Sequence, residues 1–314
     1  REQPSVYASA KVHLFAPRVT TAWRYGASPR GRTDGKASNP PSGAIVTYRL
    51  SEATKDEITL TVRDSNGDLV WLLSSVAEDA YAAVGDPDRS PDQKDKPAMK
   101  QKAGINRATW DLRFAGPKRI KGAKLDYGDP GKGALVPSGL YALELKIGEQ
   151  TLRQTLRVES DPRLSSSEDR TVQLAFTRLV SETFTAITDH VTAIRSAKAQ
   201  IEAHNRALAK TPAATKLIKM GTVLIEGLEK VEAVLHNPKA KVSYDVLAGR
   251  GGGAQLHSQL GWLLSIARQR ATPPTQGMRE LAVFVQAELQ AQAATLERLL
   301  GADLDALNAL AKQL

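Results

Sequence analysis

The chain has no cysteine among its 314 residues. Disulfide bonds, thiolate zinc sites and a cysteine nucleophile are therefore excluded. It also lacks an apolar run approaching eighteen residues, so the sequence predicts no transmembrane segment. With 41% hydrophobic and 25% charged residues the composition is that of a globular protein. The length suits two domains better than one.

Histidine is scarce and scattered along the chain. None of the five histidines has a second histidine or a pair of carboxylates at a spacing that a helix turns into a metal site. We therefore predict no metal site and no cofactor, and we expect each histidine at a helix surface or a helix cap. The five are His13, His190, His204, His236 and His257.

Two segments imitate binding motifs without completing them. Asp64–Asp68 resembles the start of a calcium loop, but Leu69 and Ser75 stand where the loop needs glycine and a bidentate acid, so we predict a hairpin turn. The glycine-rich segment Leu247–Gly253 is interpreted either as an anion site at a helix start or as a flexible connector. No Ser-His-Asp set or close carboxylate pair follows from spacing, so no catalytic residue is predicted.

The net charge of +9 is concentrated in one stretch. Between Lys94 and Lys124, ten basic residues face two acids, which gives that stretch a charge of +8. One interpretation is a docking patch for an anionic polymer such as an acidic polysaccharide, and the other is solvated loop charge. Nucleic acid is not favoured, because only Trp110 and Phe114 interleave the basic residues. The candidate docking residues are Lys118, Arg119, Lys121 and Lys124.

Residues 43–163 have the two-residue period of β-strands and predict an antiparallel β-sandwich of the Ig-like type. Trp110 lies on an alternating strand and is a predicted core residue. Two long insertions, Val76–Ala103 and Ala115–Val136, are predicted loops that are either mobile or laid across a neighbour. The predicted strands are Ala44–Leu50, Glu57–Arg63, Leu69–Ser74, Ile105–Arg113, Leu140–Ile147 and Thr151–Val158.

Residues 164–314 have helical periodicity instead. Capping-box spacing from Ser165 to Glu168 opens the first helix, whose apolar residues recur at three- and four-residue steps to Leu208. Further helices are predicted at Leu217–Leu235, at Leu256–Ala267, and from Pro274 to a break near Gly301, with a final turn or two through Leu310. Four amphipathic helices with short links predict an antiparallel four-helix bundle, so the fold class is β plus α in separate domains.

Four segments of the β region carry a resemblance to a known family. They are Asn39–Tyr48, Leu60–Gly67, Asn106–Arg113 and Pro137–Tyr141. Together they resemble the region after the propeller in bacterial secreted Asp-box (BNR) repeat proteins, which are sortilin-like β-propeller proteins often labelled glycosyl hydrolases. The β module is similar to the Ig-like domain of flagellar hook-capping proteins. The ending Asp303–Asn308 fits the same family, and His13–Pro17 resembles the exit from the propeller.

The resemblance implies a function without a catalytic residue in this chain. The propeller, where a glycosidase-like site would lie, is not part of the 314 residues. We therefore expect a C-terminal fragment or a separately processed subunit, and the start at Arg1 instead of Met predicts a processed or trimmed N-terminus. Its expected role is a structural and binding module of a secreted, periplasmic or envelope protein. The alternative is a glycoside-hydrolase-type enzyme whose active site lies on the absent propeller.

Residues 1–42 form an irregular arm and linker in this scheme. The apolar groups of Val6–Tyr25 are too numerous for a free tail, yet Pro17 and polar residues interrupt them. We expect the arm to pack on the Ig-like domain, on the helical bundle or on a propeller of the same precursor or a separate chain. The predicted anchors are His13, Phe15 and Trp23.

Overall fold

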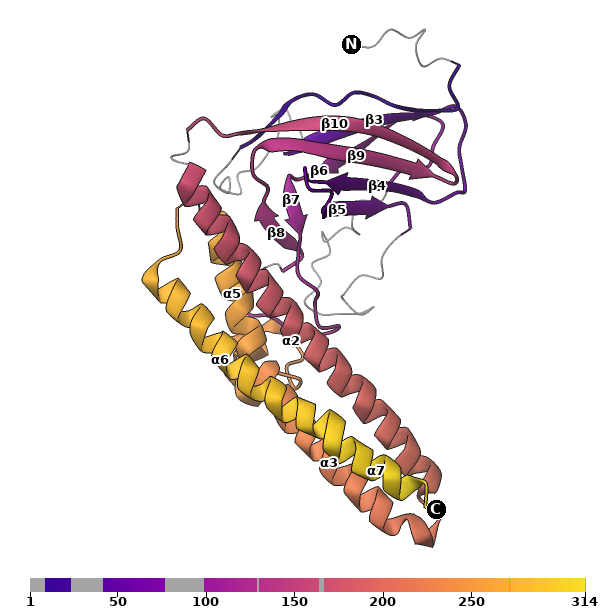
Figure 1. Ribbon diagram of the computed structural model, residues 1–314, viewed down its shortest axis with the longest axis vertical. Helices are drawn as coiled ribbons and strands as arrows, with labels where there is room; N and C mark the ends of the chain where they lie inside the picture. Colours follow the sequence, from indigo (N-terminus) through magenta and orange to yellow (C-terminus); the bar gives the residue numbers. More distant parts are fainter. Residues whose placement is uncertain are drawn as a thin grey trace. The chain divides into compact units, whose positions relative to one another are not determined.

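A computed structural model describes residues 9–23, 42–76, 99–128, 130–163, 167–270 and 272–313. It combines β-sheets with helices, so the β plus α class is confirmed (Figure 1). The chain divides into two compact units, here called the β unit and the helical unit. Over the described residues, the β unit comprises 9–23, 42–76, 99–115, 132–163 and 167–171, and the helical unit comprises 116–128, 130–131, 172–270 and 272–313.

The β unit contains two main sheets and one small one. The first sheet has the order β1 (Val12–Leu14), β3 (Ala44–Leu50), β6 (Gly104–Trp110). The second has the order β2 (Thr20–Ala22), β10 (Gln150–Ser160), β9 (Gly139–Ile147), β4 (Ile58–Arg63), β5 (Leu69–Ser74). The small sheet pairs β7 (Arg113–Ala115) with β8 (Lys132–Leu135). Among the paired strands, β2 and β10 run parallel and the other pairs are antiparallel.

The buried faces of the two main sheets share one apolar core. Alternate residues of β3 and β9 are buried, as the two-residue period of a strand requires. Trp110 is fully buried, which confirms its predicted place in the core. Its ring packs edge-on against Tyr141 at a centroid distance of 5.4 Å, and its Nε1 donates to the Arg113 carbonyl at 2.9 Å.

The predicted strands are all present, and one of them ends early. The strand expected at Ile105–Arg113 stops at Trp110, and the chain resumes as β7 at Arg113. Leu112, between the two, is buried and has a φ of 60°, a left-handed conformation that interrupts the extended backbone. The Asp64–Asp68 segment is a hairpin turn between β4 and β5, in which Asp64 Oδ1 accepts from two backbone amides.

The N-terminal arm forms two short strands of the β unit. β1 pairs with β3, and β2 pairs with β10, so the arm joins both main sheets. Leu14 and Ala22, at the ends of these strands, are buried in the shared core. Three-residue strands gain stability only by completing a larger sheet, which explains why this irregular sequence is ordered.

The helical unit is built on long amphipathic helices around one apolar core. The break predicted near Gly301 is a π-helical turn between α6 and α7. Both α6 and α7 pack alongside α3 (Figure 1). No helix in the described ranges is long and apolar enough to cross a membrane. The helices are α2 (Ser167–Leu208), η1 (Pro212–Ala214), α3 (Thr215–Leu235), α4 (Ser243–Leu247), η2 (Arg250–Gly252), α5 (Leu256–Gln269), α6 (Gln276–Arg298), η3 (Leu299–Asp303) and α7 (Leu304–Ala311).

Candidate functional site

The segment that connects strands β7 and β8 belongs to the helical unit. Residues 116–131, here called the strap, connect β7 to β8 but pack with the helices. Ile120 is buried in the helical core, and Ala123 and Leu125 pack against that core. The predicted loop Ala115–Val136 is therefore laid across a neighbour over most of its length.

Polar contacts attach the strap to α2. The Lys118 amide donates to Thr185 Oγ1 at 3.3 Å, and Thr188 Oγ1 donates to the Lys118 carbonyl at 3.0 Å. Lys118 Nζ forms an ion pair with Asp189 at 2.8 Å, with both side chains more than half exposed. An exposed pair of this kind contributes little energy, so the buried Ile120 is the stronger anchor of this end.

The basic docking candidates all lie on the strap. Lys118 and Lys121 are exposed, whereas Arg119 and Lys124 are partly buried. Lys118 is engaged with Asp189, and Arg119 and Lys124 also take part in interactions. The sequence analysis placed these basic residues in the β region, but Lys118, Arg119, Lys121 and Lys124 belong to the helical unit.

The arm candidates fall on two different sheets. His13 and Phe15 are neighbours at β1, with ring centroids 4.7 Å apart in an edge-on arrangement. Trp23 follows β2, is 43% exposed, and stacks under the Arg163 guanidinium at 5.5 Å. Leu14 and Ala22 are buried in the core, while the three candidates retain exposed surface.

A buried charge cluster in the helical unit escaped the sequence analysis. Glu232 of α3 is nearly fully buried, and its Oε1 lies 2.9 Å from Arg195 Nε of α2. His236 Nε2 lies 3.0 Å from the same oxygen. Lys198 Nζ approaches the other oxygen of Glu232 at 3.5 Å and Glu229 at 3.0 Å. Two cations and two carboxylates therefore balance one another around a buried imidazole.

The cluster includes the strap. Arg195 Nη1 donates to the Lys121 carbonyl at 2.9 Å, and Arg195 Nη2 lies 3.2 Å from His236 Nε2. Burial alone would raise the pKa of Glu232, but its hydrogen bonds with His236 and Arg195, followed by the nearby Arg195 charge, outweigh burial and lower that pKa to about 2. Glu232 is thus ionised at every physiological pH.

His257 of α5 adds a second buried imidazole. Its ring lies 4.5 Å from Phe184 and 6.4 Å from His236 between centroids. Burial, followed by the nearby His236 and Arg195, lowers the pKa of His257 to about 3, so the ring is neutral at pH 7. Within the described part of the chain, His257 Nε2 and His236 Nδ1 have no hydrogen-bond partner.

The positions of His236 and His257 correct the expectation that each histidine lies at a helix surface or a helix cap. His257 is a buried residue of α5, not a surface or cap residue. His236 is the C-cap of α3, as one alternative predicted, but it is buried. The four-residue step from Glu232 to His236 was visible in the sequence, whereas Arg195 and His257 are contributed by other helices. Over the residues that the structure describes, no three His, Asp or Glu side chains are grouped to hold a metal ion.

The glycine-rich segment is an ordered connector between α4 and α5. Gly249, Gly251, Gly252 and Gly253 have positive φ, which lets the backbone turn back on itself. The Asn237 side-chain amide donates to the carbonyls of Arg250 and Gly253 at 2.8 and 3.2 Å. The segment thus serves the packing of the helix ends, and α5 begins after it at Leu256.

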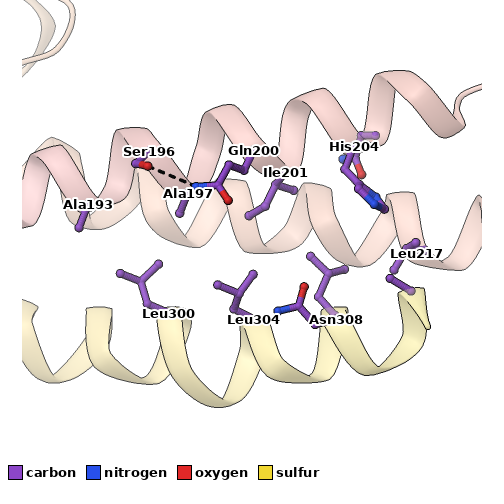
Figure 2. Close-up of a pocket in the computed structure, with 13 residues that line it drawn as sticks. Ala193, Ser196, Ala197, Gln200, Ile201, His204, Leu217, Leu300, Leu304 and Asn308 are labelled. Atoms are coloured by element: carbon purple, nitrogen blue, oxygen red, sulfur yellow. Dashed lines mark hydrogen bonds between the residues drawn. The ribbon is translucent and has the colours of Figure 1, made fainter. Parts of the chain in front are cut away.

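The second feature of the helical unit is a groove of about 450 Å³ between α2 and the C-terminal helical segment. Figure 2 shows Leu300 and Leu304 pointing from that segment toward α2, where Ala197 and Ile201 face them. The groove opens because α2 presents short alanine side chains here. A further hollow of about 510 Å³ shares Ala193 and Leu300 with it, so the seam continues along α6.

The groove has a polar side as well as an apolar wall. His204 and Asn308 line it, and Gln200 Nε2 donates to Ser196 Oγ at 3.3 Å (Figure 2). Its volume falls in the range of roughly 300 to 1,000 Å³ that is typical of small-molecule sites. The arrangement can therefore receive an apolar group and hydrogen-bond a polar one.

Comparisons with known proteins leave the family open. No protein-family description and no curated protein matches the chain. Among solved structures, one titled "pT26-6p" is 9% identical, with a TM-score of 0.18. The match covers 82% of this chain, which spans 46% of the length of that structure. A likeness at this level carries neither fold nor function.

Proposed function

We propose that this chain is a non-catalytic structural and binding module, C-terminal to the propeller of a secreted or envelope β-propeller protein. The observation that carries the proposal is the arm: β1 and β2 enter both main sheets of the β unit. A propeller joined ahead of residue 12 would be connected to the β unit through β1 and β2, which are fixed by strand pairing, and not through a flexible linker. That is the mechanical property a brace requires.

Within this proposal the β unit is an Ig-like sandwich. Its two main sheets share one core, as in sandwiches generally. The Tyr141 hydroxyl donates to the Pro137 carbonyl four residues upstream at 2.7 Å, which resembles the tyrosine corner of Ig-like domains. The helical unit is proposed to be a four-helix bundle, with α2, α3, α5 and the α6–α7 segment around its core.

The proposed binding surfaces are the two candidate sets from the sequence. Trp23, with its half-exposed ring stacked on Arg163, is the proposed contact for a propeller. The exposed basic residues of the strap are the proposed contact for an anionic polymer of the cell envelope. Both surfaces are on described residues and can be tested separately.

The experiment that tests the module is to identify and then reassemble its precursor. Intact mass and N-terminal sequencing of the native protein should reveal a propeller ahead of this chain or in a partner chain. The separately produced propeller should bind the chain in calorimetry, and Trp23→Ala should weaken binding while the exposed Val19→Ala should not. A native protein without any propeller would overturn the proposal.

The alternative function, a glycoside hydrolase with its active site on the propeller, is separated by activity. Full-length precursor and isolated chain are incubated with chromogenic glycosides at equal concentration. Turnover by the precursor alone supports the alternative while keeping this chain non-catalytic. Turnover by the isolated chain contradicts the assignment of a non-catalytic module.

A further inference from the structure

Arg195 connects three partners that would otherwise be independent. Its Nε donates to Glu232 Oε1, and its Nη1 donates to the Lys121 carbonyl of the strap. Its Nη2 lies 3.2 Å from His236 Nε2. Anything that draws Arg195 away from this position therefore removes a hydrogen bond from the strap.

His236 competes with Arg195 for one carboxylate oxygen. Arg195 Nε and His236 Nε2 approach Glu232 Oε1 at 2.9 and 3.0 Å. Arg195 can only donate hydrogen bonds. Neutral His236 therefore has two options: with Nε2 unprotonated it accepts from Arg195 Nη2, and with Nε2 protonated it donates to Glu232. Doubly protonated His236 can only donate, and it then places a second cation 3.2 Å from Nη2.

The charged groups around the imidazoles are balanced only while both rings are neutral. α2 contributes Arg195 and Lys198, and α3 contributes Glu229 and Glu232. α5 contributes His257 itself, whose other close neighbour on α2 is the apolar Phe184. Charging His236 and His257 adds two positive charges beside the buried Glu232, whose carboxylate is already paired. The strap carries one more buried carboxylate oxygen, Asp126 Oδ1, which has no hydrogen-bond partner in the described ranges.

We propose that the strap is a proton-controlled latch on the helical unit, closed when His236 and His257 are neutral and released when they are protonated. Protonated His236 takes over Glu232, Arg195 is repelled, and the Lys121 carbonyl loses its donor. Release exposes both imidazoles to water, so the open state binds protons more readily than the closed state. The remaining strap contacts at Lys118 and Ile120 then hold an otherwise loosened segment.

Hydrogen exchange of the strap amides tests the latch directly. Exchange of the amides between Ile120 and Gly128 is followed by mass spectrometry at about pH 7.5 and about pH 4.5, with correction for the intrinsic exchange rate. We expect the corrected rate to rise by about tenfold or more, because the open state binds protons at the lower pH that the closed state does not. The amides of α6 should change much less over the same interval.

Three variants separate the latch from general acid sensitivity. Arg195→Gln should give the acid-like strap rate already at about pH 7.5. The double variant His236→Gln and His257→Gln should abolish the acid-induced rise, provided that circular dichroism shows the native helix content. Lys118→Gln, which removes a strap contact outside the cluster, should raise exchange equally at both pH values.

Two results would overturn the proposal. One is a strap rate that rises together with the rate of the α3 and α6 amides, which would mean global unfolding. The other is an acid-induced rise that survives in the double histidine variant. If the double variant does not fold, the Arg195→Gln result decides: a strap rate that still rises by the wild-type factor on acidification rejects the latch.

Discussion

Gly128 of the strap lies directly against Gly261 of α5. A β-carbon at position 128 would be 2.6 Å from the Gly261 carbonyl oxygen, closer than such atoms approach in proteins. The two backbones are in direct contact here, and this close approach of the C-terminal end of the strap to α5 is possible because neither residue has a side chain. Because Gly261 is one helical turn from His257, this contact stands next to the buried charge cluster.

The first prediction concerns this contact. Gly128→Ala should lower the free energy of unfolding by more than Gly122→Ala, which is the matched control. Both glycines have positive φ, 96° and 76°, so both substitutions incur backbone strain, but a β-carbon at Gly122 meets nothing within 4 Å. Chemical denaturation of both variants measures the difference, which we expect to be about 1–3 kcal/mol. Equal losses would show that the Gly128–Gly261 contact does not position the strap.

The second prediction concerns the N-terminal arm. Leu14→Ala should destabilise the protein by about 2–5 kcal/mol, because it empties a fully buried site in the shared core. Val19→Ala, at a residue 57% exposed in the same arm, should change stability by less than about 0.5 kcal/mol. Thermal or urea denaturation distinguishes the two. A Leu14→Ala protein as stable as the wild type would mean that the arm does not complete the β unit.

The third prediction concerns the carboxylate of the buried cluster. Glu232→Gln removes the carboxylate that accepts from the partly exposed Arg195 (39%) and contacts the buried His236, which should cost about 1–3 kcal/mol. Glu229→Gln is the control, because the Glu229 side chain is 55% exposed and its pair with Lys198 should contribute at most about 1 kcal/mol. The comparison is made at about pH 7.5 by urea unfolding. Similar losses in the two variants would contradict a special role for Glu232.

The fourth prediction is the pH dependence of stability. The pKa of His257 is about 3 in the folded protein and 6.5 in its ordinary state, so its contribution is complete above pH 6.5 and is lost as the pH falls toward 3. Glu232, whose pKa is lowered from 4.5 to about 2, contributes above pH 4.5 and loses that contribution below it. Between pH 6.5 and 4.5 only the histidine acts among these two groups, with a limiting slope of about 1.4 kcal/mol per pH unit. His257→Gln should flatten the measured slope there, and an unchanged slope would assign the acid sensitivity elsewhere.

The fifth prediction concerns the core of the β unit. Trp110→Ala should destabilise by about 3–5 kcal/mol, because a fully buried indole is removed from contact with Tyr141. Trp110→Phe keeps most of the ring but removes the donor to the Arg113 carbonyl, which should cost about 1 kcal/mol plus a packing loss. Near-ultraviolet circular dichroism checks that each variant retains its fold. A smaller loss for alanine than for phenylalanine would contradict this order.

Local periodicity was enough to predict the longer strands and helices. Alternation at Ala44–Leu50 reflects a strand with one buried face. This strand and the one at Leu69–Ser74 have the predicted ends. The three- and four-residue steps from Val180 to Leu208 likewise reflect one buried helix face in α2. The strand predicted at Ile105–Arg113 ends early, at Trp110, and Leu112 beyond it has a left-handed backbone that the local sequence does not signal.

The sequence by itself determined where the longer strands and helices form, that Trp110 is buried, and that Asp64–Asp68 is a turn, because each depends on neighbours along the chain. The short strands of the arm and β8, which lies inside a predicted loop, were not predicted, because such short strands exist only through pairing with distant segments. Tertiary structure alone decided which unit owns the strap, which sheets receive the arm, and that Arg195, Glu232, His236 and His257 meet. Glu232 and His236 are one helical turn apart, but Arg195 comes from α2 and His257 from α5, at separations that carry no periodic signal. Their meeting depends on how the helices pack, and packing is a property of the whole core that no local pattern contains.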